Sequence, residues 1–163
     1  MSIEEIIDQL PQYNTKYITV TGGEPLAQKN CLPLLSQLCD LDYDVSLETS
    51  GALIIADVDR RVSRVVDVKT PGSGECERNL IENFQQMSWH DQFKFVLCDR
   101  ADYEWSKAFI EQYSLIGISE IFFSTSFGQI EPVELADWIL EDQLKVRFQL
   151  QLHKILWADE PGR

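Results

Sequence analysis

Two adjacent glycines and an acid, in Gly22-Gly23-Glu24, directly follow a run of strand-forming residues near the start of the chain. Residues 17–21 are β-branched or aromatic, and Pro25 behind Glu24 prevents the strand from continuing. Because glycine lacks a Cβ, a ligand can lie against the bare backbone there, and the Glu24 carboxylate suits an ammonium group. The alternative is an ordinary strand-to-helix turn in which the glycines only permit the bend.

Polar residues end the other expected strands as well, and these strands cover residues 44–48, 63–68, 93–97 and 119–123. The polar groups are Glu48-Thr49-Ser50, Lys69, Asp99 and Ser124-Thr125-Ser126. Helices are expected at residues 3–10, 30–40, 53–59, 76–88, 101–114 and 132–141. This alternation predicts an α/β fold with one parallel sheet, in a single domain over residues 1–163. Parallel strands gather their carboxyl ends on one rim, which is therefore the expected binding site.

Helix patterns add detail to this scheme. Ser2 with Glu5 three positions later predicts a capping box at the first helix. The helix at 30–40 is expected to turn Leu32, Leu35, Leu38 and Cys39 toward the sheet. The helix at 101–114 is expected to do so with Trp105, Ala108, Phe109 and Gln112.

A last strand is expected at residues 145–152, where apolar and polar residues alternate. The apolar set is Val146, Phe148, Leu150 and Leu152, and the polar set is Arg147, Gln149, Gln151 and His153. An edge strand with one solvated face explains this pattern. The other interpretation is that the polar face lines a cavity, where glutamine amides suit a purine-like edge because each offers a donor and an acceptor.

Composition excludes several classes of partner. The chain has 163 residues and a net charge of −13, which argues against nucleic acid and against an anionic membrane surface. Its N-terminus is acidic rather than a signal peptide, so a cytoplasmic protein is expected. The four cysteines form no Cys-x-x-Cys pair and match no metal spacing; they are Cys31, Cys39, Cys76 and Cys98.

The Thr21-Gly22-Gly23-Glu24-Pro25 sequence resembles the methionine-binding motif of radical S-adenosylmethionine (SAM) enzymes. Nearly the whole chain, to Trp157, resembles the 7-carboxy-7-deazaguanine synthase family of that superfamily. The matching stretches are Leu47-Glu48-Thr49-Ser50-Gly51, Asp67-Val68-Lys69-Thr70-Pro71-Gly72-Ser73-Gly74, Phe123-Ser124-Thr125-Ser126-Phe127-Gly128 and Gln149-Leu150-Gln151-Leu152-His153-Lys154. The resemblance implies a partial (βα) barrel of parallel strands that lacks its first βα unit.

The resemblance also implies site residues. Those expected at SAM are Gly22, Gly23, Glu24, Pro25, Glu48, Ser50, Asp67, Val68, Lys69, Ser124, Thr125, Ser126 and Phe127. Those expected at the substrate are Thr21, Gln151 and His153. Thr125 stands where the family has a proline, and Thr49 and Ser50 also suit a simple helix cap. No catalytic residue is assigned. The tail from Ala158 is expected to be a polar terminus that closes over the pocket.

The implied reaction is reductive cleavage of SAM, hydrogen abstraction from 6-carboxy-5,6,7,8-tetrahydropterin, and ring contraction to 7-carboxy-7-deazaguanine in queuosine biosynthesis. It needs a [4Fe–4S] cluster, Mg²⁺ and an electron donor of the flavodoxin or ferredoxin type, and the family is expected to form homodimers. The cluster cysteines and the Mg²⁺ ligand belong upstream of Gly22, where this sequence has no cysteine. The chain is therefore expected to be an N-terminally truncated, inactive form or a degenerate relative. A protein like a glycyl-radical activating enzyme and a non-catalytic SAM- or nucleotide-binding remnant stay open as alternatives.

Overall fold

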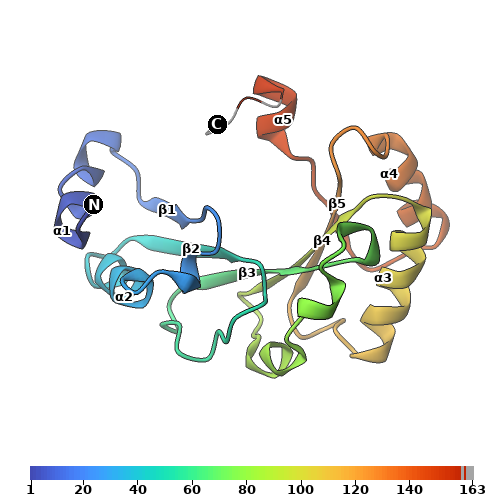
Figure 1. Cartoon of the computed structure of the whole chain (residues 1–163). Coiled ribbons are helices and arrows are strands. Elements are labelled where there is room, and N and C mark those ends of the chain that lie inside the picture. Colours follow the sequence, from blue (N-terminus) through green and yellow to red (C-terminus); the bar gives the residue numbers. More distant parts are fainter. Residues whose placement is uncertain (159, 161–163) are drawn as a thin grey trace.

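A computed structural model of the chain describes residues 1–158 and 160. The sheet has six parallel strands in the order β1-β2-β3-β4-β5-β6, so each strand pairs with its predecessor in the sequence (Figure 1). The strands are β1 (Tyr17–Val20), β2 (Asp44–Thr49), β3 (Ser63–Val68), β4 (Gln92–Leu97), β5 (Glu120–Thr125) and β6 (Arg147–Phe148). The predicted α/β class and parallel sheet are confirmed.

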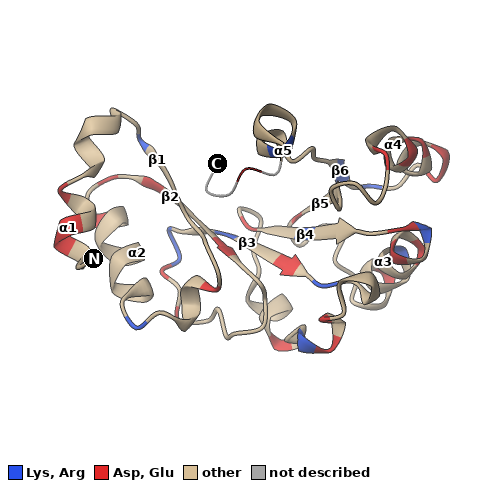
Figure 2. Ribbon diagram, turned by 45° about the horizontal axis from the view of Figure 1, so that its top comes forward, with Lys and Arg blue, Asp and Glu red and all other residues tan. Residues whose placement is uncertain are grey.

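Helices or 3₁₀ turns lie in all but one of the connections between strands, and turns alone join β2 to β3. The α-helices are α1 (Ile3–Ile7), α2 (Cys31–Asp40), α3 (Arg100–Gln112), α4 (Pro132–Glu141) and α5 (Leu152–Trp157). Short 3₁₀ turns are η1 (Leu10–Tyr13), η2 (Pro25–Ala27), η3 (Pro71–Ser73), η4 (Cys76–Arg78) and η5 (Ile81–Gln86). The capping box between Ser2 and Glu5 is confirmed at α1. Figure 2 shows acidic and no basic residues on α1 and α4, in keeping with the net charge of −13.

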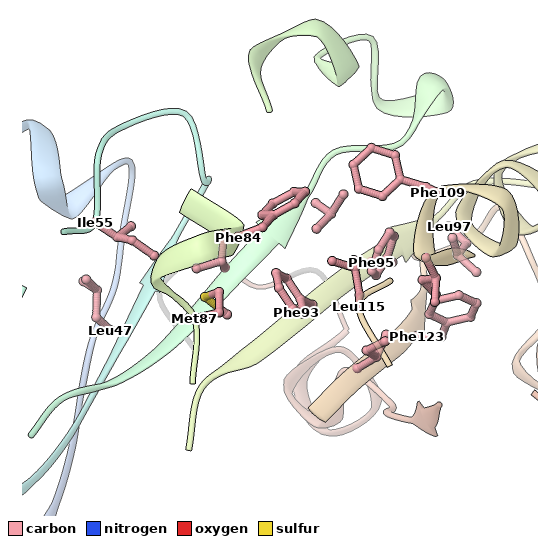
Figure 3. Packing of buried hydrophobic residues seen from close by; sticks show 14 of the residues in the cluster. Leu47, Ile55, Phe84, Met87, Phe93, Phe95, Leu97, Phe109, Leu115 and Phe123 are labelled. Carbon is pink, nitrogen blue, oxygen red and sulfur yellow. The ribbon is translucent and has the colours of Figure 1, made fainter. Parts of the chain in front are cut away.

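One face of the sheet is buried and the other is half open. Alternate residues of β2, β3 and β4 are buried, and this face packs against α2, α3 and η5. Figure 3 shows the resulting core, in which Phe84 on η5 lies edge-on to Phe93 on β4, with ring centroids 5.3 Å apart. Such pairs add about 0.5–1.5 kcal/mol beyond burial. The half-open face carries polar side chains such as Glu48, Asp67 and Lys94 together with apolar ones such as Val65 and Val96.

Two expected helices are absent. Residues 53–59 form turns, and residues 76–88 form η4 and η5 with no α-helix. The Asn83 side chain accepts a hydrogen bond from the Ile55 amide at 3.2 Å and donates to the Leu53 carbonyl at 2.8 Å. These backbone groups are satisfied by a side chain rather than by a helical ladder, so the loop after β2 needs no helix.

The prediction of a last strand at residues 145–152 is mostly wrong. Strand β6 has two residues, and residues 152–157 turn into α5. Pairing with β5 ends where the Gln149 amide donates to the Phe123 carbonyl at 2.9 Å. Residues 150–157 therefore do not present the alternating faces of a strand.

The predicted buried faces of α2 and α3 are only partly confirmed. Leu35 and Leu38 on α2 are buried as expected, but Leu32 is exposed and Cys39 is half-buried. On α3, Phe109 is buried as expected and Trp105 only half-buried, while Ala108 and Gln112 are exposed. The buried α3 residues are Asp102, Tyr103, Ser106, Phe109 and Ile110, because Tyr103 rather than Trp105 fills the space against β5.

Candidate functional site

The Gly22-Gly23 turn leaves the carboxyl end of β1 without side chains. Both glycines have positive φ, of 98° and 47°, and both face open space at the position of a Cβ. Their exposed backbone is therefore accessible, as the sequence predicted. Thr21 and Gly22 line a cavity of about 560 Å³ between α1, β1 and α2, and Pro25 lies at its buried side.

The Glu24 carboxylate joins this turn to the end of β2. It accepts hydrogen bonds from the Leu26 amide at 3.0 Å, the Thr49 hydroxyl at 2.9 Å and the Ser50 amide at 2.8 Å. The Ser50 hydroxyl also donates to it. Glu24 therefore fixes the relative positions of two loops that the sequence assigned to SAM.

Those hydrogen bonds control the charge of Glu24. Partial burial raises its pKa, but the bonds from Ser50, Leu26 and Thr49 outweigh burial and hold the pKa below its ordinary value. The group is a carboxylate at neutral pH, and no described cation forms a salt bridge with it.

A second cavity, of about 400 Å³, lies at the carboxyl ends of β3 and β4. Its lining includes Asp67, Val68, Lys69, Thr70, Gly72, Ser73, Val96, Cys98, Ser126 and Gln129. Lys69 Nζ lies 2.7 Å from Asp67 Oδ2. The structure thus brings together the predicted Asp67–Lys69 segment and Ser126, which the sequence separates by more than fifty residues.

The backbone of Lys69 is held by one side chain. Asn79 Oδ1 accepts from the Lys69 amide at 2.8 Å, and Asn79 Nδ2 donates to the Lys69 carbonyl at 2.9 Å. The amide of Asn79 therefore continues the ladder where β3 ends. Its role was missed because an isolated asparagine in an expected helix carries no signal of its partner.

The open face of the sheet carries Glu48 and Lys94. Lys94 Nζ lies 3.7 Å from Glu48 Oε2, and the two side chains are 19% and 45% exposed. Lys94 was not predicted, although a lysine between Phe93 and Phe95 in a buried strand was a visible signal. Thr19 on β1 and Ser46 on β2 share a hydrogen bond of 2.9 Å between their hydroxyls.

The remaining predicted residues separate into different places. Thr125, Phe127 and Gln151 line a third cavity, of about 290 Å³. Ser124 is fully buried and donates to the Gln149 carbonyl at 2.8 Å, so its hydroxyl ties the segment after β6 to β5. His153 is exposed on α5 and lines none of these three cavities. Part of the tail expected to close the pocket lies outside the described residues.

Metal-binding groups are dispersed. Within residues 1–158 and 160, no three His, Cys, Asp or Glu side chains gather as a metal site. The four cysteines are free: Cys31 is buried on α2, and burial raises the pKa of the Cys31 and Cys98 thiols. The described residues thus do not fit an iron–sulfur cluster. No described helix has the length and apolar character of a membrane span.

Comparison with known proteins identifies the family. The chain is 43% identical over 161 residues to 7-carboxy-7-deazaguanine synthase of Chlorobaculum tepidum, and the match covers 96% of this chain and 73% of that protein. The chain belongs to the 7-carboxy-7-deazaguanine synthase family. A protein of the same name from Koribacter versatilis is 41% identical over 157 residues, covering 88% of this chain and 70% of the relative. No family model matches the chain.

Solved structures agree on the fold. The crystal structure of QueE from Escherichia coli superposes with a TM-score of 0.72 at 17% identity, covering 93% of this chain and 64% of that one. Streptococcus suis SuiB bound to S-adenosylmethionine superposes with a TM-score of 0.62 at 13% identity, covering 91% of this chain and 40% of SuiB. The synthase-family chain therefore has the parallel α/β fold of these proteins, and the family places it among radical SAM enzymes.

Proposed function

We propose that this chain provides the SAM- and substrate-binding walls of a 7-carboxy-7-deazaguanine synthase. The reaction of that enzyme converts 6-carboxy-5,6,7,8-tetrahydropterin to 7-carboxy-7-deazaguanine with loss of ammonia, which is carbon–nitrogen lyase chemistry. The observation that carries the proposal is the shared rim of the sheet. The Gly22-Gly23 turn, Glu24 and the cavity around Lys69 and Ser126 all lie at the carboxyl ends of parallel strands.

The chemistry of this rim fits SAM. Bound SAM supplies a cationic sulfonium whose cleavage starts the reaction, and its ammonium group needs acceptors. The exposed Gly22 and Gly23 carbonyls are suitable acceptors, and the ionised Glu24 beside them favours a positive charge. Lys69 supplies a positive charge for a carboxylate or a hydroxyl of the ligand.

The substrate is assigned to Thr21, Gln151 and His153. Gln151 at the third cavity offers one donor and one acceptor to a pterin edge. His153 stands two residues further along, on α5. We place the substrate between these groups and the open face that carries Glu48 and Lys94.

A [4Fe–4S] cluster supplies the electron in this family, and the described residues do not fit one. We therefore derive no step through it, and we expect this chain by itself to bind SAM without turnover. Mg²⁺, a flavodoxin- or ferredoxin-type donor, a homodimer and a cytoplasmic location belong to the same proposal. Formation of 7-carboxy-7-deazaguanine by the isolated chain under anaerobic, reducing conditions would contradict the expected inactivity.

Calorimetric titration of the chain with SAM tests the binding proposal. We expect saturable binding, weakened at least fivefold by Lys69→Met, which removes a charge from the wall of the 400 Å³ cavity. Lys145→Met is the matched control, because Lys145 lines a different cavity at the amino ends of β5 and β6. An equal effect of both substitutions would show that net charge, not the site, governs affinity. Absence of SAM binding would leave the family fold with another role.

A further inference from the structure

Asp102 is a buried carboxylate in the first turn of α3, with 1% of the residue exposed. It accepts hydrogen bonds from Thr70 Oγ1 at 2.8 Å, the Gly72 amide at 2.8 Å and the Cys98 amide at 2.9 Å. None of the three donors carries a charge. Its charge is therefore stabilised by dipoles, including the amino end of α3, and it joins the loop after β3 to the end of β4.

The loop lies so close to this carboxylate that only glycine fits. A Cβ at Gly72 would lie 2.5 Å from Asp102 Oδ2 and 2.9 Å from Cys98 Cβ. Both distances are shorter than real contacts allow, so a side chain at Gly72 would force the loop and α3 apart. The position of the loop is thus set by direct contact with Asp102.

Three partners of Asp102 line the 400 Å³ cavity, but Asp102 itself does not. Thr70, Gly72 and Cys98 form part of the cavity wall, next to the Lys69 backbone that Asn79 holds. Asp102 and Asn79 therefore fix the segment at successive points along the chain.

We propose that Asp102 is a positioning residue of the cofactor site, because its carboxylate shapes the cavity wall made by Thr70, Gly72 and Cys98. The inference rests on the proposed function, since it takes SAM as the ligand of that cavity. Asparagine cannot replace Asp102, because one of its two oxygens becomes an NH₂ group that would face an N–H or O–H donor.

The experiment compares Asp102→Asn with Tyr103→Phe by calorimetric titration with SAM. Tyr103 is the neighbouring residue, is equally buried, and donates its hydroxyl to the Trp138 carbonyl at 2.8 Å, away from the cavity. Both variants lose buried hydrogen bonds and are expected to melt earlier than the wild type. We expect Asp102→Asn to weaken SAM binding at least tenfold and Tyr103→Phe less than twofold.

Amide hydrogen exchange gives a readout that does not depend on the ligand. The Gly72 and Cys98 amides are expected to exchange at least tenfold faster in Asp102→Asn and unchanged in Tyr103→Phe. If Asp102→Asn fails to fold, Thr70→Val and Thr70→Ser decide, because only serine keeps the hydroxyl donor. Thr70→Val is expected to weaken SAM binding about threefold, and Thr70→Ser to restore it.

The outcomes separate the two proposals. If the wild type binds SAM and Asp102→Asn binds it as well as Tyr103→Phe does, the positioning role is overturned and the proposed function stands. If the wild type does not bind SAM, the proposed function is overturned and this inference falls with it.

Discussion

Two buried carboxylates lie just before and just after β4, and different kinds of partner hold them. One lies where the strands begin, here called the amino edge of the sheet, and the other lies where they end, here called the carboxyl edge. Asp91 at the amino edge is fully buried and faces Arg64, with Nη2 to Oδ2 at 2.6 Å and Nε to Oδ1 at 3.0 Å. Ser88 adds its amide and hydroxyl at 2.9 and 2.7 Å. Asp102 at the carboxyl edge has only amide and hydroxyl partners.

Under the proposed function, this difference distinguishes a structural end of the sheet, at the amino ends of the strands, from a ligand-binding end at their carboxyl ends. At the amino edge an opposite charge neutralises Asp91, so the network is complete within the protein. At the carboxyl edge Glu24 and Asp102 are bonded only by neutral donors, and their negative charge is uncompensated by their own contacts. A cationic ligand such as a sulfonium gains from that arrangement.

The largest effect is expected at the amino edge. Arg64→Ala would leave Asp91 buried without its counter-charge and should lower the free energy of unfolding by about 3–5 kcal/mol. Urea denaturation measures this loss. Arg61→Ala is the control, because Arg61 pairs with Asp59 and Asp40 at the surface and should cost about 1 kcal/mol or less. Equal losses would contradict the structural role assigned to the amino edge.

Gly72→Ala tests the contact at the carboxyl edge. Overpacking against Asp102 should cost about 1–3 kcal/mol and should also weaken SAM binding. Gly117→Ala is the comparison: Gly117 lies at the amino-edge cavity in open space, and its φ of +90° alone should cost about 1–2 kcal/mol. We expect SAM titration to separate the variants, with Gly117→Ala binding as the wild type does. Unchanged SAM affinity in Gly72→Ala would contradict the proposal that the contact between Gly72 and Asp102 shapes the SAM cavity.

Acid unfolding should reveal how much the ionised Glu24 carboxylate contributes to stability. Its pKa is below the ordinary value in the folded chain, so its contribution to stability is complete above the unfolded pKa, about 4.3, and is lost as pH falls through the lower folded value. The free energy of unfolding, measured between pH 6 and 3, should fall less steeply for Glu24→Gln, by a fraction of the one-proton limit of about 1.4 kcal/mol per pH unit, because Glu24 is only partly buried. Parallel curves for both proteins would show that Glu24 has the same pKa folded and unfolded.

The smallest effect is expected for Trp89→Ala. Trp89 is 84% exposed at the amino edge, between two cavities. Its removal should change the free energy of unfolding by about 0.5 kcal/mol or less, and SAM affinity by less than twofold. A larger loss of SAM binding, measured by the same titration, would place part of the site at the amino edge and contradict its proposed position at the carboxyl edge.

Much of the scaffold was predictable because it depends on local patterns. β-branched and aromatic runs placed β1 to β5 within about two residues, and parallel pairing then fixed which ends meet. The contact of the Glu24 turn with Ser50 follows from that topology. Even so, the sequence could not show that the Glu24 carboxylate accepts hydrogen bonds from Thr49 and Ser50 of the same chain, because these bonds depend on the distance between two loops.

The rest depends on partners far along the chain. Asn79 and Asn83 bond to backbone groups of loops that lie 10 and 28 residues away, and the local pattern of residues 76–88 does not reveal those partners. For Asp102 a signal existed, because an acid shares the buried stripe of α3 with Ser106, Phe109 and Ile110. The end of β6 had no such signal: the alternation continues to residue 152, but the chain leaves β5 after Phe148 although β5 runs to Thr125.

The strand order has a consequence for how the protein is made. Since every strand lies beside the one synthesised just before it, no strand waits for a distant partner strand, and the connections to be closed have 13 to 23 residues each. The sheet can therefore grow strand by strand as the chain is synthesised. The loop after β3 is an exception, because it receives its final contacts only when α3 delivers Asp102. Folding intermediates that contain β1 to β3 alone should already have a sheet but no shaped cavity.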